Sequence, residues 1–183
     1  LCVGRQDYQK AHEIAVLAFS ELAGEFPDSV LWLAGREGGN SPLVQSAIAQ
    51  SPYRDRIVCL GERSDVADLL SAADAFVMPS RFEGLAGSVI EAMSLEVPLV
   101  LTDIPVFREV ADNRALFFRR DDAEGLAASL RAVAAGEYPA GWVEELRERA
   151  EQVFDIKSVT AELADFYVKN CRKLPSRPRT GEF

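Results

Sequence analysis

Short apolar runs alternate with longer segments of helical periodicity along most of this chain, and the alternation limits the folds it can adopt. Parallel strands must be joined by crossovers of a dozen or more residues, which are usually helices. The runs are apolar throughout, as is typical of strands that helices cover on both faces. We therefore predict a Rossmann-like three-layer α/β/α sandwich with about six parallel strands, at residues 1–4, 30–34, 57–60, 75–78, 99–102 and 116–118.

The segments between and after these runs carry the helical spacing of apolar residues. Two of them begin at residues that favour helix N-termini, Ser64-Asp65 and Asp121-Asp122, because their side-chain oxygens can accept hydrogen bonds from free backbone N–H groups. We expect helices at residues 9–26, 41–49, 65–73, 87–94, 122–135, 142–153 and 156–172.

Length and charge bound the class of protein. A chain of 183 residues can bury one substantial hydrophobic core but hardly two, so we expect one domain. Its formal net charge of -9 leaves no basic face of the kind that binds nucleic-acid phosphates. The three cysteines, Cys2, Cys59 and Cys171, indicate neither a disulfide framework nor a zinc site, because they are far apart and odd in number. We therefore expect no nucleic-acid partner and a reducing, cytoplasmic setting.

The two ends of the chain differ in character. The first residues, Leu1-Cys2-Val3-Gly4, are already typical of a buried strand that runs into a glycine turn, so we expect further chain upstream. After residue 173 the sequence is polar and rich in proline, which is typical of a disordered tail or an appended remnant. The predicted domain spans residues 1–173 and the predicted tail residues 174–183. No apolar run reaches the ~18 residues that a membrane span requires.

The loop after the run at 75–78 holds the strongest candidate for a ligand site, because ligands of parallel sheets bind beyond the carboxyl ends of the strands. Glu83 and Glu91 frame residues 84–88, a segment of mostly small residues at a helix start. Free backbone N–H groups and the positive end of the helix dipole favour a diphosphate there, and small residues let it approach the backbone. Glu91 lies about one turn into the helix, where its carboxylate can accept hydrogen bonds from two ribose hydroxyls.

The spacing Glu83-x7-Glu91 lies within SRFEGLAGSVIEAMSLEVPLVLTDIPVFREV, which resembles the signature of the group 1 glycosyltransferases, family 4 of the glycosyltransferases. The resemblance continues in VGRQDYQKAHEIAVLAF, CLGERSDVADLLSAADAFVMPS and VFDIKSVTAELADFY. It implies the C-terminal, donor-binding half of a GT-B enzyme that transfers sugar from a nucleoside-diphosphate sugar to an acceptor hydroxyl with retention of anomeric configuration. The N-terminal acceptor domain would then be missing, this chain alone would be inactive, and any peripheral association with a membrane would depend on the missing half.

The resemblance also implies a role for each matching residue. Glu83 would hold hydroxyls of the donor sugar, and Glu91 would hold the ribose. Arg5 and Lys10 would neutralise the diphosphate, whose negative charge grows as the glycosidic bond breaks. Two cations and a helix dipole would then replace a metal ion, so we expect no metal and no other cofactor. The remaining donor-binding residues are Gly61, Glu62 and Arg63 beside the base, Gly84, Leu85 and Ala86 at the phosphates and sugar, and Gly4 in the first glycine turn.

Four segments depart from the family pattern, one of which is residues 115–120, where the family has a glycine-containing segment. His12 stands near the place where the family has a glycine after the lysine, and this affects which residue here matches that lysine, assigned above to Lys10. Ser94-Leu95-Glu96 replaces a small residue followed by a glycine, which concerns the shape of that turn. Ala86-Gly87 replaces a commoner glycine or proline pattern, which concerns the sugar pocket.

Each candidate also has a purely structural interpretation. Glu83 and Glu91 could be exposed carboxylates that the helix dipole stabilises by a few tenths to about 1 kcal/mol, and Arg5 and Lys10 could be solvated charges. We interpret His12 as a surface or packing residue rather than a catalytic base. Two other functions stay open: a sugar-nucleotide epimerase, which shares the GT-B architecture and needs no acceptor, and a non-catalytic nucleotide-sugar-binding module.

Overall fold

The computed structural model describes residues 1–171, and its single parallel sheet confirms the predicted architecture. The strands lie in the order β3-β2-β1-β4-β5-β6, so the winding direction of the chain reverses between β1 and β4. Such a reversal opens a crevice at the carboxyl ends of the two strands. The predicted tail, residues 174–183, lies outside the described residues. The strands are β1 (Cys2–Val3), β2 (Leu31–Ala34), β3 (Ile57–Gly61), β4 (Phe76–Met78), β5 (Leu99–Thr102) and β6 (Leu116–Phe118).

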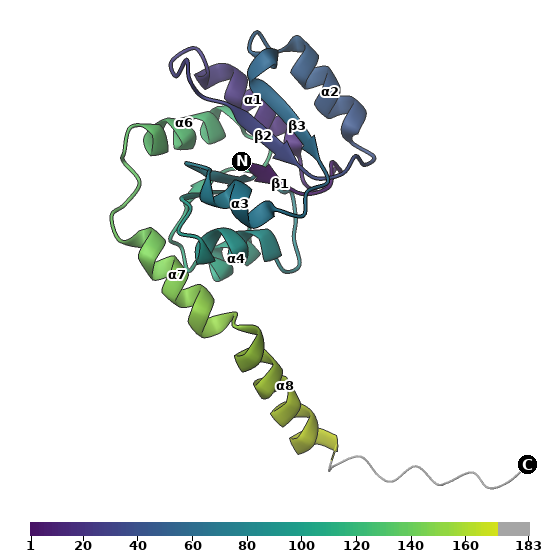
Figure 1. Cartoon of the computed structure of the whole chain (residues 1–183), viewed down its shortest axis with the longest axis vertical. Helices are drawn as coiled ribbons and strands as arrows, with labels where there is room; N and C mark the ends of the chain where they lie inside the picture. Colours follow the sequence, from purple (N-terminus) through teal and green to yellow (C-terminus); the bar gives the residue numbers. More distant parts are fainter. Residues whose placement is uncertain (172–183) are drawn as a thin grey trace, which may run out of the picture.

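Helices cover both faces of the sheet and complete the three layers (Figure 1). On one face α1 (His12–Leu22) lies between α2 (Ser41–Gln50) and α6 (Ala123–Ala134). Side chains alternate between the faces, because Phe76 and Met78 pack on one side of the sheet and Val77 on the other. The opposite face carries α3 (Val66–Ser71), α4 (Gly87–Ser94), α5 (Pro105–Val110) and α7 (Trp142–Val153).

The first helix is shorter at both ends than predicted. It begins at His12 instead of residue 9, because Ala11 has a left-handed backbone with φ 50° that cannot continue a helix backwards. It ends at Leu22, and Pro27 disfavours helical backbone at Phe26. The consequence for the site is that Lys10 lies in a loop and not on the helix.

Two other expectations about local structure are wrong. Helix α5 was not predicted, since its six residues are too few to show a period and Pro105 stands at its first turn. Strand β3 lies at the sheet edge and exposes Val58 and Cys59, so it is not covered on both faces as its apolar sequence suggests.

The two predicted N-terminal caps have different outcomes. The carboxylate of Asp122 accepts a hydrogen bond of 2.8 Å from the backbone N–H of Gly125, which confirms the cap of α6. Asp65 stands at the N-cap of α3 but makes no capping hydrogen bond. Its carboxylate instead pairs with Arg63, which lowers the pKa of Asp65. A nearby guanidinium thus competes successfully with the helix end for the same oxygens.

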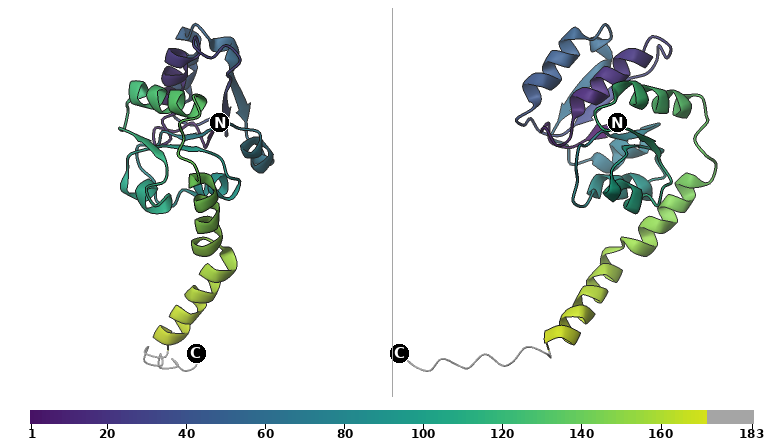
Figure 2. Two further views of the ribbon diagram at one scale, coloured as in Figure 1. Left: turned by 90° about the vertical axis from the view of Figure 1, so that its left-hand side faces the viewer. Right: turned by 180° about the vertical axis from the view of Figure 1, so that it is seen from behind.

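The last helix, α8 (Ile156–Cys171), projects away from the sheet, as the two further views show (Figure 2). It follows α7 after a short break and exposes large apolar side chains along its length, including Ile156, Leu163 and Phe166. Propensity and amphipathic spacing are enough to predict this helix, whose boundaries agree closely with the expected 156–172.

The turn after α4 has the backbone shape that favours glycine although Glu96 occupies it, with φ 57°. A left-handed backbone destabilises an L-residue by about 1–2 kcal/mol, while glycine loses about 0.5–1 kcal/mol through its freedom in the unfolded chain. We therefore expect Glu96→Gly to raise the free energy of unfolding by about 0.5–1 kcal/mol, as measured by urea titration.

The matched control for that variant is Glu96→Ala, which keeps the strain and removes only the exposed ion pair of 3.0 Å with Arg147. Exposed pairs contribute little, so Glu96→Ala should stay within about 0.5 kcal/mol of the parent protein. A loss of stability in Glu96→Gly would show that the turn is not strained.

Candidate functional site

Two of the predicted catalytic residues meet where the sheet reverses its winding. Lys10 lies in the loop after β1, and Glu83 lies in the loop after the neighbouring strand β4. The Lys10 ammonium is 2.7 Å from Oε1 of Glu83, and the Glu83 side chain is only 5% exposed. The structural interpretation of Glu83 as an exposed carboxylate is therefore wrong. A nearly buried ion pair at the mouth of a crevice is typical of a functional site.

Gln9 holds the same carboxylate from its other side. Its Nε2 donates to Oε2 of Glu83 at 3.0 Å and to the carbonyl of Phe82 at 3.0 Å. The backbone N–H of Arg81 in turn donates to the carbonyl of Gln9 at 2.8 Å. The loops after β1 and β4 are thus joined by backbone and side-chain hydrogen bonds, which fix the direction of the Glu83 carboxylate.

The Arg81 side chain joins the loop after β4 to the residues that follow β1. Its side chain is 11% exposed, and its guanidinium lies 2.8 Å from Glu13, which is 6% exposed. It also donates to the carbonyl of Tyr8 at 2.6 Å. Asp121 lies 2.7 Å from its Nε but out of line for a hydrogen bond, so that contact is an ion pair. Asn40 at the start of α2 donates to the second oxygen of Glu13 at 2.7 Å.

Close backbone approach explains the glycines at the first two strand ends. Gly4 has φ 150°, and a Cβ there would lie 3.1 Å from the Lys10 side chain, which passes over it. Gly35 has φ 145°, and a Cβ there would lie 1.9 Å from the Gly4 carbonyl oxygen. A side chain at Gly35 would therefore force the backbone at Gly4 away, whereas one at Gly4 would displace only the Lys10 side chain.

The remaining predicted phosphate-binding groups lie at the start of α4. Gly84 and Leu85 are exposed and Ala86 is buried. Their backbone N–H groups donate to no acceptor within residues 1–171, which leaves them free for an anion. Glu91 is exposed on α4, and the structure brings it into no ion pair within the same residues. Arg5 is exposed at the rim and pairs with Asp7.

A pocket of about 340 Å³ lies over the carboxyl ends of β1, β2 and β3. It brings together four predicted residues, Gly4, Arg5, Glu62 and Arg63, with Arg36, which was not predicted. Gly61 stands directly before Glu62 with φ 67°, so it turns the chain out of β3 toward this pocket.

His12 is a buried packing residue, as expected. It is 1% exposed and its Nδ1 has no partner among residues 1–171. Burial, reinforced by the charge of Lys10, lowers the pKa of His12 to about 4. Ala11, which directly follows Lys10, has a left-handed backbone with φ 50°, a shape that favours glycine.

Buried polar atoms without partners gather at these same loops. Within residues 1–171 they include Oε1 of Gln6, Nδ1 of His12 and Oγ of Ser80. Gln6 and His12 follow β1, and Ser80 follows β4. Most buried polar atoms in proteins are hydrogen-bonded, so a group of exceptions around one crevice supports its assignment as the functional site.

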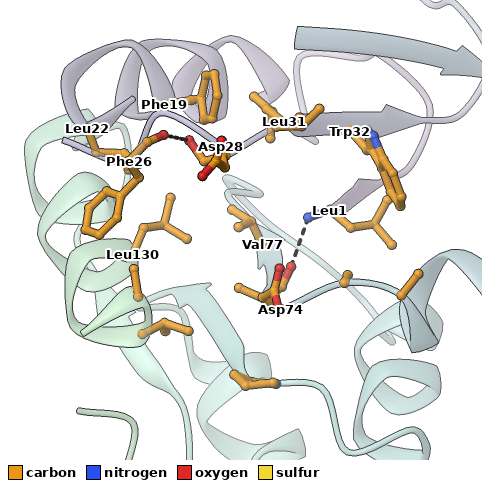
Figure 3. Close-up of a pocket in the computed structure, with 18 of the residues that line it drawn as sticks. Leu1, Phe19, Leu22, Phe26, Asp28, Leu31, Trp32, Asp74, Val77 and Leu130 are labelled. Carbon is orange, nitrogen blue, oxygen red and sulfur yellow. Dashed lines mark hydrogen bonds between the residues drawn. The ribbon is translucent and has the colours of Figure 1, made fainter. Parts of the chain in front are cut away.

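A larger cavity of about 640 Å³ opens at the amino ends of the strands (Figure 3). It is lined by Leu1, which directly precedes β1, by Leu31 and Trp32, the first two residues of β2, and by the carboxylates of Asp28 and Asp74. The amino ends of parallel strands face the negative ends of the crossover helices, and they lack the free N–H groups that bind phosphate. We therefore place the functional site at the carboxyl ends despite the smaller pocket.

Sequence reasoning missed Gln9, Glu13 and Arg81 as parts of the site. All three lie inside segments that resemble the family, but Arg81 and its partner Glu13 are 68 residues apart, so their contact is not visible in the sequence. Asp121, predicted as a capping residue with Asp122, pairs with Arg81 instead.

Residues 1–171 contain neither a candidate metal cluster nor a helix that could span a membrane. No group of three or more His, Cys, Asp or Glu side chains there has an arrangement that could hold a metal ion. No helix in the same part of the chain is long and apolar enough to cross a membrane.

The family profile described as glycosyl transferases group 1 matches residues 1–136. This match covers most of the chain and includes the loops that carry Lys10, Glu83 and Glu91. The chain belongs to the group 1 glycosyltransferases.

Curated relatives are glycosyltransferases that differ in substrate. The lipopolysaccharide core biosynthesis mannosyltransferase LpsB of Rhizobium meliloti (strain 1021) is 33% identical over 139 residues, which are 72% of this chain and 40% of that protein. Glycogen synthase of Mycobacterium tuberculosis (strain ATCC 25618 / H37Rv) is 30% identical over 175 residues, 92% of this chain and 42% of that protein. The chain therefore spans less than half the length of these curated relatives.

Solved structures of similar fold are GT-B glycosyltransferases. Alr3699/HepE of Anabaena, in complex with UDP, has a TM-score of 0.81 at 18% identity, covering 92% of this chain and 48% of that one. Sucrose-phosphate synthase of Thermosynechococcus elongatus has a TM-score of 0.82 at 22% identity, covering 94% and 46%. At these identities the likeness shows the fold alone, which is that of one half of a GT-B enzyme.

Proposed function

We propose that this chain is the donor-binding half of a retaining glycosyltransferase, which transfers a sugar from a nucleoside-diphosphate sugar to an acceptor hydroxyl. The contact of Lys10 with Glu83 at the topological switch point carries the proposal, because it places a cation and a carboxylate beside the free N–H groups of residues 84–86. A diphosphate can bind to the cation and to the N–H groups, and a sugar hydroxyl can donate a hydrogen bond to the carboxylate. The UDP bound by a solved structure of the same fold is consistent with such a donor.

Each residue has a specific task in this proposal. Lys10 turns from Glu83 to the diphosphate, and Arg5 meets it from the rim, so that both stabilise the negative charge of the leaving group. Glu83 accepts hydrogen bonds from sugar hydroxyls, held in place by Gln9. Glu91 accepts hydrogen bonds from the two ribose hydroxyls. These two cations and the N-terminus of α4 supply positive charge that a metal ion supplies in other transferases, so we propose that no metal is required.

Ligand-observed NMR of the 183-residue protein with UDP, GDP and ADP tests the nucleotide site. We expect one nucleotide series to bind, and we expect Glu91→Ala to weaken its binding by about ten- to a hundredfold, since the variant removes charge-assisted hydrogen bonds to the ribose. The matched control is Glu148→Ala, an exposed glutamate on α7 whose loss should leave binding unchanged.

Binding that survives in Glu91→Ala would remove the ribose role of Glu91. Binding of no nucleotide at millimolar concentration would overturn the proposal that the site holds a nucleoside-diphosphate sugar. When the chain is joined to an acceptor-binding half, the anomeric configuration of the product decides between retention and inversion. Release of an isomerised free sugar, without any acceptor, would favour the epimerase.

A further inference from the structure

The pocket over β1, β2 and β3 is lined by apolar side chains and by charged side chains of both signs. Its inner wall is apolar, formed by Val3, Ala34 and Val66, and it can take the flat face of a base. Its charged lining residues are Glu62, Arg36, Arg63 and Arg5, and Arg5 is already paired with Asp7. A base that binds in this pocket must therefore present hydrogen-bond donors to the Glu62 carboxylate and hydrogen-bond acceptors to the guanidinium groups.

The charged side chains of this pocket differ in the ion pairs and hydrogen bonds that they already make. Arg63 is held by Asp65, with Nε 2.8 Å from Oδ1 and Nη2 2.5 Å from Oδ2. Glu62 and Arg36 are exposed, and neither side chain has an ion pair or hydrogen bond within residues 1–171. Glu62 and Arg36 are thus the acceptor and the donor that are free to meet a ligand.

Guanine alone among the common bases matches this pair. Its N1–H and 2-amino group are adjacent donors, which the two oxygens of one carboxylate can accept together. Its O6 and N7 are adjacent acceptors, which a guanidinium binds in a bidentate manner. Uracil has a single N–H between two carbonyl oxygens, so a carboxylate that accepts from it also faces at least one of those oxygens. Adenine has one amino group and no neighbouring ring N–H.

We propose that this pocket selects guanine, with Glu62 accepting hydrogen bonds from N1–H and the 2-amino group and Arg36 donating to O6 and N7. The proposal rests on the nucleotide-sugar function proposed above and narrows its donor to guanosine-diphosphate sugars. It also assigns Arg36, which no sequence motif singles out, as a specificity-determining residue.

Titration of the 183-residue protein with GDP, UDP, ADP and inosine diphosphate tests the proposal. Inosine diphosphate differs from GDP only by the missing 2-amino group, so it probes the contact with Glu62 directly. We expect GDP to bind more tightly than each of the other three by about ten- to a hundredfold, as is typical of lost hydrogen bonds to a charged group. In Glu62→Gln the gap between GDP and inosine diphosphate should shrink to less than about threefold.

The matched control is Glu37→Gln, which removes an exposed carboxylate beside Arg36 that does not line the pocket, and which should keep the full gap. Tighter binding of UDP or ADP, or a gap that persists in Glu62→Gln, would overturn the selection of guanine while the nucleotide-sugar function stands. Binding of none of the four would overturn that function as well.

Discussion

Arg81→Leu is expected to lower the free energy of unfolding by about 3–5 kcal/mol, measured by urea titration at neutral pH. The guanidinium is 11% exposed and the Glu13 carboxylate is 6% exposed, so the variant leaves a negative charge buried beside Asn40 without its counter-ion. Removal of one partner from a buried pair is far more damaging than the net contribution of the pair, because the remaining charge has lost both water and partner. The loop that carries Glu83 also loses its tie to the carbonyl of Tyr8.

A matched exposed pair provides the control for Arg81. Arg131 joins α6 to Glu25 at 2.8 Å, also across a long stretch of chain, but its side chain is 36% exposed and that of Glu25 is 52% exposed. Arg131→Leu should therefore lower the free energy of unfolding far less than Arg81→Leu does. Arg81→Lys keeps the charge but not the planar fork, so it should lie between the two and remain folded if Arg81→Leu does not. Equal losses in Arg81→Leu and Arg131→Leu would mean that the buried network adds no stability.

The second large effect is a loss of stability in mild acid that depends on His12. Burial, reinforced by Lys10, lowers the pKa of His12 to about 4 from an ordinary value of 6.5. Between these two values the unfolded chain binds a proton that the folded protein does not bind, so stability falls as pH falls through this window. The full loss is about 3 kcal/mol, of which about 2 kcal/mol is gone at pH 5.

Urea titrations at pH 7.5 and pH 5 of the parent protein and of His12→Leu isolate this contribution. Carboxylates titrate in both proteins, whereas only the parent protein has the imidazole. The parent should therefore lose about 2 kcal/mol more than the variant between the two pH values. Parallel losses would show that His12 becomes protonated in the folded protein as readily as in the unfolded chain.

Most of the fold could be predicted because its signals are local. The apolar runs and the helical spacing depend on neighbouring residues, and α4 and α7 begin and end where predicted. The failures occur where a particular backbone turn or side-chain contact overrides the pattern of apolar and capping residues. Helix α1 starts late because Ala11 is held in a left-handed turn beneath the site, and Asp65 leaves its cap because Arg63 takes its carboxylate.

The candidate site could be predicted only as a set of separate residues. Glu83 and Glu91 are candidates because they frame a helix start at a strand end, and the resemblance to the group 1 glycosyltransferases adds Arg5 and Lys10. Their mutual contacts are not recognisable, and neither is Arg81, whose partners lie in three other segments. Single positions carry no information about which loops become neighbours.

The sequence by itself determined that this chain forms a doubly wound parallel sheet, and it predicts an anion site at the carboxyl ends of the strands, since periodicity and helix starts are properties of consecutive residues. The tertiary structure alone decided that Lys10 forms an ion pair with Glu83 and that Glu62 and Arg36 line the same pocket. Both juxtapositions depend on strand order. Because β1 pairs with β2 on one side and with β4 on the other, loops that are some seventy residues apart in the chain are brought within hydrogen-bonding distance.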